Sequence, residues 1–340
     1  MAPGAAVRIA TLVCSGAEMM ARYTALQRAL AGALLCACAA CASTPAVDPA
    51  YRPVENALEV IAVLRAHIDD DTYRFEPARD FTGRNVYRSS LLRLENLEQL
   101  HPDAYRAGHL DGAIAFAKAR SLERLRAFDL AAENYRLAAS ISDELRVEAL
   151  RSAEICDTLQ EAAQMARALT PASEAPGSEA LDTDAALAEF EARVALLDGL
   201  ARIAEDTHQL PIALEEIERA DMERAAYFAG RRTVDAGGDV RAIAELQRVI
   251  QRHAASKRIN RHLLALADLY AELAAEYSSA YPPESLLFDP VRFQELVDGA
   301  SRLYETVASR DGTPEKVEAS RRLEAFLAFS IRIDRDRFTP

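Results

Sequence analysis

Apolar residues recur every three or four positions along most of this 340-residue chain, which is the spacing of one face of an α-helix. Ala57, Ile61 and Leu64 mark the first such face, and Pro53 precedes it at a position suited to a first helical turn. Alternating runs of β-branched residues are nearly absent, so strands are not expected. The pattern predicts an all-α fold of about 10–11 helices. They are expected at residues 53–68, 85–100, 103–127, 129–140, 143–169, 184–206, 211–235, 239–254, 257–280, 290–309 and 314–334.

Two segments interrupt this helical pattern. Residues 70–84 are predicted to form a loop. Residues 170–183 contain two prolines, a glycine and small polar residues, a composition typical of a linker. The sequence therefore predicts an N-terminal helical region at 55–169, a linker at 170–183 and a C-terminal helical region at 184–335.

Residues 1–40 have the three-part organisation of a secretory signal peptide. A short basic stretch ends at Arg28, and the uncharged apolar run 29–40 follows it. This run is too short to cross a bilayer core of roughly 30 Å as a helix. Because residues 1–18 precede an otherwise ordinary signal, translation is expected to start at Met19 or Met20.

The end of this segment resembles the lipobox of bacterial lipoproteins, in which small residues precede a cysteine that is modified with lipid. The segment Cys38-Ala39-Ala40-Cys41 matches at both alanines and at the second cysteine, and it carries Cys38 where leucine is usual. The resemblance implies lipidation at Cys41, with Cys38 as the alternative acceptor.

The residues after Cys41 resemble the tether of such a lipoprotein. Residues 41–54 contain three prolines and are predicted to link the anchor to the helices. In that family a residue other than aspartate after the cysteine favours the outer membrane, and here the residue is Ala42. The resemblance implies an outer-membrane lipoprotein facing the periplasm. An ordinary cleaved signal that releases a soluble periplasmic protein is the alternative.

Small and large residues recur along the predicted hairpins with a spacing that resembles the tetratricopeptide repeat. Small residues let two helices approach closely, and the large residue beside them fills the gap. One hairpin cannot bury its apolar face alone, so the resemblance implies antiparallel helical hairpins stacked as a solenoid over about residues 110–310. The packing positions of the three copies are Ala119, Leu122, Ala131, Tyr135 and Ala138; Gly230, Ala242, Leu246 and Val249; and Ala267, Tyr270, Ala300 and Tyr304.

The charge and the repeat resemblance together indicate the class of partner. The chain carries a net charge of −13 and has no basic stripe, whereas nucleic-acid binding depends on clustered positive charge. The repeat resemblance instead implies a protein or peptide partner, held in a groove. Aromatic and arginine side chains are enriched at binding hot spots, so candidates for the groove are Arg120, Arg124, Tyr227, Arg231, Tyr270 and Tyr277.

The chain has no sequence motif of a catalytic or cofactor site: no Gly-x-Gly-x-x-Gly, no His-Glu-x-x-His and no Gly-x-Ser-x-Gly. Neither a metal nor a cofactor is expected, and the chain is not expected to be an enzyme. The acidic run at 69–71 is interpreted as a solvated helix end. Cys156 is predicted to be a small buried apolar group. His253 and His262 flank a predicted turn and are expected to face water. The pairs Glu215-Glu216 and Glu272/Glu276 are interpreted as surface residues that pair with arginines at helical spacing.

The sequence thus favours a membrane-anchored periplasmic scaffold or adaptor that binds a protein of a cell-envelope assembly. Two other functions stay open. One is a helical envelope enzyme acting on wall material or lipid, with carboxylates from the loops at 70–84 and 279–290. The other is a soluble periplasmic binding protein.

Overall fold

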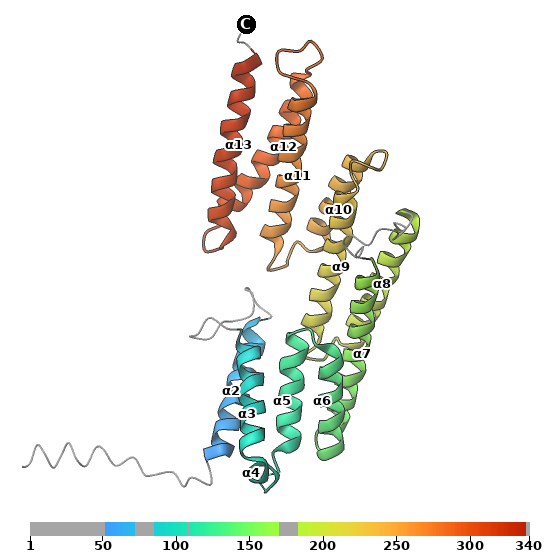
Figure 1. The fold of residues 1–340 in the computed structure, drawn as a ribbon, viewed down its shortest axis with the longest axis vertical. Coiled ribbons are helices and arrows are strands. Elements are labelled where there is room, and N and C mark those ends of the chain that lie inside the picture. Colours follow the sequence, from blue (N-terminus) through green and yellow to red (C-terminus); the bar gives the residue numbers. More distant parts are fainter. Residues whose placement is uncertain (1–51, 72–84, 108, 170–182, 338–340) are drawn as a thin grey trace, which may run out of the picture. The chain divides into compact units, whose positions relative to one another are not determined.

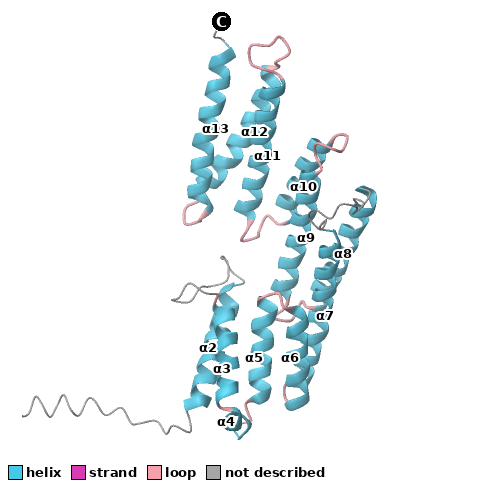
Figure 2. Ribbon diagram, viewed as in Figure 1, coloured by secondary structure: helices cyan, strands magenta, loops and turns pink. Residues whose placement is uncertain are grey.

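The computed structural model describes residues 52–71, 85–107, 109–169 and 183–337 of the chain. Within these ranges the regular elements are twelve helices and no strand, so the all-α prediction is confirmed (Figures 1 and 2). They are α2 (Arg52–Asp71), α3 (Val86–Leu100), α4 (Pro102–Ala107), α5 (Asp111–Arg124), α6 (Phe128–Ile141), α7 (Arg146–Leu169), α8 (Thr183–Ile203), α9 (Leu210–Gly230), α10 (Gly238–Arg252), α11 (Ile259–Ala280), α12 (Pro290–Ala308) and α13 (Glu315–Arg337).

The chain divides into two compact units, residues 1–55 and residues 56–340. Apart from the start of α2, every described helix belongs to the second unit. Within this second unit, helices that are consecutive along the chain also pack against one another, from α5 through to α13. Short turns join most of them, which makes neighbouring helices antiparallel.

Local signals fix several helix ends where the sequence predicts them. Asn85 precedes α3, and its side-chain oxygen accepts hydrogen bonds from the backbone N–H groups of Tyr87 (2.9 Å) and Arg88 (3.3 Å). Asp289 caps α12 in the same way, accepting from the Val291 N–H at 2.9 Å, and Pro290 occupies the first turn. Such caps satisfy N–H groups that have no partner inside the helix.

The prediction of a single helix at residues 103–127 is wrong, because the structure divides this segment into α4 and α5. The break lies at His109, whose φ of 54° is in the left-handed region. The Leu110 N–H then bonds back to the Tyr105 carbonyl oxygen at 3.0 Å. This turn allows Tyr105 on α4 and Ile114 on α5 to enter the same buried cluster.

Four buried clusters form the core, and adjacent clusters share helices. The first joins α2, α3, α4 and α5; the second runs from α5 to α9; the third and fourth join α9 to α13. The second cluster contains Leu159 of α7 and Leu197 of α8, so one core includes helices from both sides of the predicted linker. Residues 170–182 themselves lie outside the described residues.

The length of the turn decides whether a hairpin keeps the predicted repeat spacing. The α5–α6 turn contains only residues 125–127, and Ala119 and Ala131 are both fully buried across it. The α9–α10 turn is longer, at residues 231–237. The separation of Ala119 and Ala131 along the chain, counted back from Ala242, leads to Gly230. This residue lies at the exposed end of α9, where an added Cβ would meet nothing within 4 Å. The prediction that Gly230 is a packing position is wrong for this reason.

The α9–α10 hairpin requires a glycine at the first residue of α10. A Cβ on Gly238 would lie 2.2 Å from the backbone oxygen of Arg232, which is far inside contact distance. We expect Gly238→Ala to lower the free energy of unfolding by about 1–3 kcal/mol, measured by urea denaturation.

Gly199→Ala is the matched control for this substitution. Gly199 lies within α8, where an added Cβ would meet nothing within 4 Å. Alanine is the better helix former, so this variant should gain about 0.5–1 kcal/mol. Equal effects of the two substitutions would contradict the close approach at Gly238.

Candidate functional site

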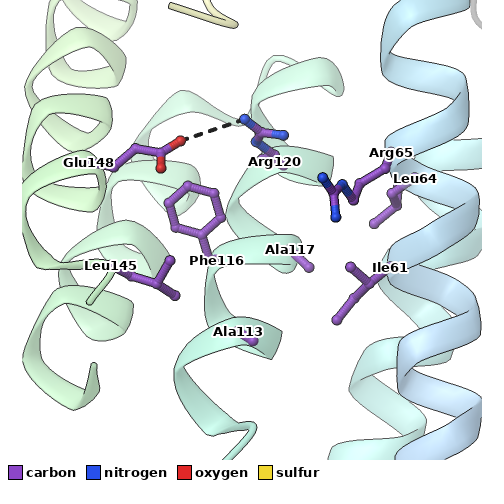
Figure 3. A pocket seen from close by; sticks show the side chains of 9 residues that line it. All are labelled: Ile61, Leu64, Arg65, Ala113, Phe116, Ala117, Arg120, Leu145 and Glu148. Atoms are coloured by element: carbon purple, nitrogen blue, oxygen red, sulfur yellow. Dashed lines mark ion pairs between the residues drawn. The ribbon is translucent and has the colours of Figure 1, made fainter. Parts of the chain in front are cut away.

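A groove of about 390 Å³ lies where α2, α5 and the start of α7 face one another (Figure 3). The residues that line this groove come from three helices that are separated in the sequence. The packing of these helices therefore brings the lining residues together. The lining residues are Ile61, Leu64 and Arg65 of α2; Ala113, Phe116, Ala117 and Arg120 of α5; Leu145, just before α7; and Glu148, in the first turn of α7.

The groove is apolar at one end and charged at the other. In Figure 3 the guanidinium groups of Arg65 and Arg120 lie at the same end, with the Glu148 carboxylate on the far side of Arg120. Ala113 and Leu145 lie towards the other end. A ligand with an apolar part and an anionic part therefore finds both kinds of surface in one groove.

Helix α5 places its groove residues by its repeat of three and four residues. Ala113, Phe116 and Arg120 follow one another at this spacing along the face that looks into the groove. The flanking faces are buried on both sides: Ile114 packs in the cluster shared with α2, and Ala119 in the cluster shared with α6. Packing on two sides fixes the direction in which the groove face points.

Arg120 combines a weak ion pair with an aromatic contact. Its Nη2 lies 3.7 Å from the Glu148 carboxylate, beyond hydrogen-bond distance. Its guanidinium carbon lies 5.5 Å from the centroid of the Phe116 ring, a cation–π distance. The Arg120 Nε is buried and makes no hydrogen bond within the described part of the chain. The Arg120 side chain therefore keeps donor capacity that Glu148 does not use.

Phe116 is held from behind by Tyr135 of α6. The two rings meet edge to face with centroids 5.0 Å apart. The Tyr135 hydroxyl donates to the Glu123 carboxylate at 2.8 Å and lies 3.2 Å from His208 Nε2. A predicted packing residue thus connects the groove wall to a buried polar network.

This network is centred on Glu123, which is 1% exposed. His208 Nε2 lies 2.9 Å from one carboxylate oxygen, and the Gln209 side chain donates to the other at 3.4 Å. Burial, and after it the Glu123 charge, raises the pKa of Tyr135 well above its usual value. The same two causes raise the pKa of Cys156, which is buried as predicted and therefore stays a thiol at neutral pH.

A second buried network joins α9 to the end of α10, the turn that follows it and the start of α11. Glu218 lies 2.5 Å from both His262 Nε2 and Ser256 Oγ. Asp221 lies 2.8 Å from His253 Nε2 and accepts from Arg248 at 2.8 Å. The expectation that His253 and His262 face water is therefore wrong, because each is buried or nearly so against a carboxylate of α9.

The hydrogen bonds of this network lower the pKa values of both carboxylates. Burial alone would raise the pKa of Glu218, but hydrogen bonds from His262 and Ser256 outweigh it. Burial would also raise the pKa of Asp221, and there hydrogen bonds from His253 and Arg248 lower it below its usual value. Both groups are consequently charged at neutral pH and contribute to the junction between these helices.

The glutamates interpreted from the sequence as surface ion pairs differ in their exposure. Glu276 is exposed, as predicted, but its partner is Arg232 of the α9–α10 turn and not an arginine at helical spacing on α11. Glu216 is buried, at 3% exposed, and both its oxygens accept from Arg126, at 2.6 and 2.8 Å. The interpretation of Glu216 as a surface residue is wrong, because tertiary packing encloses this part of α9.

The predicted packing residues mostly lie in the seams between helices. Burial of this kind is needed in any packed helical array, so it leaves the repeat family itself a proposal. Tyr270 is half-buried, with its ring against Gly299 of α12. The fully buried or nearly buried members are Ala119, Leu122, Ala131, Tyr135, Ala138, Ala242, Leu246, Val249, Ala267, Ala300 and Tyr304.

Of the six residues expected to line a groove, the structure places only Arg120 there. Tyr277 is buried in the core, and Arg231 pairs with Asp235. Arg65 and Phe116 were not predicted from the sequence. The helical spacing of Ala113, Phe116 and Arg120, next to the packing positions, could have indicated the wall that α5 contributes to the groove. No local sequence pattern indicates that α2 forms the opposite wall.

Several predictions fall outside the described residues, including lipidation at Cys41 or Cys38 and the signal peptide. The loop predicted at 70–84 starts too early, because α2 continues to Asp71, and its remaining residues 72–84 lie outside the described ranges. In the described ranges no cluster of three or more His, Cys, Asp and Glu side chains is placed to hold a metal ion. None of the helices described combines the length and apolar character needed to cross a bilayer. In the loop after α11, Glu284 is exposed and Asp289 caps α12.

Comparison with known proteins does not assign this chain to a family. No protein-family model matches it, and no curated protein matches it.

The α9 network predicts a loss of stability in acid. Both carboxylates have lowered pKa values, so their contribution is present above their ordinary pKa values and is lost as the pH falls through the folded-state values, below about pH 4. We expect Asp221→Asn to cost about 1–3 kcal/mol at pH 7, measured by urea denaturation. The same variant should depend less on pH than the parent between pH 7 and pH 3. Parallel pH profiles would contradict the role of Asp221 in this acid dependence.

Proposed function

We propose that this chain is a lipid-anchored adaptor of the bacterial cell envelope that binds a segment of a partner protein in the groove between α2, α5 and α7. The single observation that carries the proposal is the groove itself. It has a volume of about 390 Å³, a largely apolar lining and arginine side chains at one end. Apolar pockets with a few convergent polar groups are the usual form of binding sites.

Three further features support the proposal. The lipobox-like segment at Cys38–Cys41 favours attachment to a membrane by lipid rather than by a spanning helix. The helices pack in sequence order with small residues in their seams, as tetratricopeptide-like hairpins would. The strongly acidic chain disfavours nucleic acid as the partner. Assembly of outer-membrane proteins, secretion, pilus support and wall maintenance are all settings in which such an adaptor would serve.

The anchor is tested by substituting the proposed acceptor. Each buried methylene of an acyl chain adds about 0.8 kcal/mol to membrane binding, so losing the chains should release the protein. We expect Cys41→Ala to move the full chain from the membrane fraction to the soluble periplasmic fraction and to abolish fatty-acid labelling. Release by Cys38→Ala alone would assign the acceptor to Cys38. Unchanged fractionation and no labelling in the parent would remove the anchor and favour the soluble alternative.

The binding groove is tested by site-specific photo-crosslinking in the native envelope. A photoreactive residue replacing Leu145 lies in the groove, whereas one replacing Leu137 lies on α6 outside the groove lining and is exposed. We expect the Leu145 position to crosslink to one defined protein, identified by mass spectrometry, and the Leu137 position not to reach it. Identical products from both positions, or none from Leu145, would contradict the groove as the binding site.

A further inference from the structure

We propose that the groove selects an extended peptide segment in which an apolar side chain and a carboxylate lie two residues apart. This inference rests on the proposed function, because it names the chemistry of the partner for the same groove. It follows from the convergence of two guanidinium groups, from the apolar surface beside them and from the distance between these two regions.

The charged end of the groove is suited to a carboxylate. Arg65 and Arg120 come from different helices and direct their guanidinium groups to the same end. Glu148 is the acidic residue in the lining, and its side chain is 57% exposed and 3.7 Å from Arg120. A carboxylate in the groove would receive charge-assisted hydrogen bonds from the exposed side chain of Arg65 and from Arg120, whose Nη2 lies beyond hydrogen-bond distance of Glu148.

The apolar end is suited to one aliphatic or aromatic side chain. Ile61 and Ala113 lie on facing walls, and Leu145 lies on the other side of Ala113 from Ile61. The Phe116 ring separates this end from Glu148 and is fixed by its edge-to-face contact with Tyr135. A wall that is already in place lowers the entropy cost of binding.

The distance between the two ends determines the spacing in the ligand. Ile61 and Arg65 are four residues apart on α2, and Ala113 and Arg120 are seven residues apart on α5. A helix rises 1.5 Å per residue, so the backbone positions of these pairs are separated by about 6 Å along α2 and about 10.5 Å along α5. In an extended peptide, side chains two residues apart point to the same side and are about 7 Å apart. Adjacent side chains would point to opposite sides.

Charge complementarity favours an acidic peptide over other anions. The chain as a whole carries −13, so an anionic lipid surface is repelled while a short ligand can still enter the locally positive end. A small inorganic anion would leave the apolar end of the groove uncovered. A peptide with both groups covers the whole lining.

The test uses a fluorescent glycine–serine peptide, blocked at both ends, that carries leucine and glutamate two positions apart. Its binding to the full chain is followed by fluorescence anisotropy. Replacing glutamate with glutamine, replacing leucine with serine, or placing the two residues next to each other should each weaken binding about tenfold. A peptide with leucine and a free carboxyl end replacing glutamate distinguishes a chain terminus from an acidic side chain as the source of the carboxylate.

Two groove variants and one matched variant complete the experiment. Arg120→Gln and Arg65→Gln should each weaken binding of the parent peptide about tenfold. Arg93→Gln also removes one positive charge, but Arg93 lies on α3 outside the groove lining, paired with Glu59 at 3.4 Å, so its effect should stay within twofold. Circular dichroism monitors folding, and the exposed position of Arg65 keeps that variant informative if Arg120→Gln unfolds.

The outcomes separate this inference from the proposed function. No saturable binding of the parent peptide, or equal binding of the glutamate and glutamine peptides, overturns the inference even if a partner crosslinks at Leu145. If the peptide series behaves as expected while no envelope protein crosslinks there, the inference stands and the adaptor function falls.

Discussion

The arrangement around the groove depends on α5, a helix of 14 residues that packs on two sides and leaves a third side free. Ile114 and Ala117 enter the cluster shared with α2 and α3, and Ala115 and Ala119 enter the cluster shared with α6 and α7. The small side chains allow neighbours to approach closely, because less volume separates the helix axes. Between these two seams the larger Phe116 and Arg120 face outward, and they form one wall of the groove.

Helix positions could largely be predicted from the sequence, because the signals that set them are local. The apolar periodicity, the cap at Asn85 and the Asp289-Pro290 start of α12 each act within one or two turns. The segment 103–127 marks the limit of such local signals. Its composition suits one helix throughout, but burying both Tyr105 and Ile114 in one cluster requires the left-handed residue at His109. That requirement is set by tertiary packing, and neighbouring residues do not reveal it.

The candidate site was less predictable than the fold. Arg120 was expected in a groove on the basis of residue type alone, and the structure places it in the lining of the groove between α2, α5 and α7. Arg65 contributes only because α2 packs beside α5, and no pattern within α2 indicates its neighbour. The same limit applies to His253 and His262: their spacing around a turn suggested exposure, whereas the carboxylates that bury them belong to α9. Contacts between distant segments decided each of these cases.

The Glu123 network has a consequence for how the chain can be divided. Its carboxylate lies on α5, Tyr135 lies on α6, and His208 and Gln209 lie beyond the predicted linker, just before α9. A buried carboxylate needs its hydrogen-bond partners, since an unsatisfied one carries a large desolvation cost. A fragment ending near residue 170 would keep the acid and lose two of these partners. The helices from α5 to α9 therefore form one unit, because a chain that contains only part of them leaves Glu123 without some of its hydrogen-bond partners.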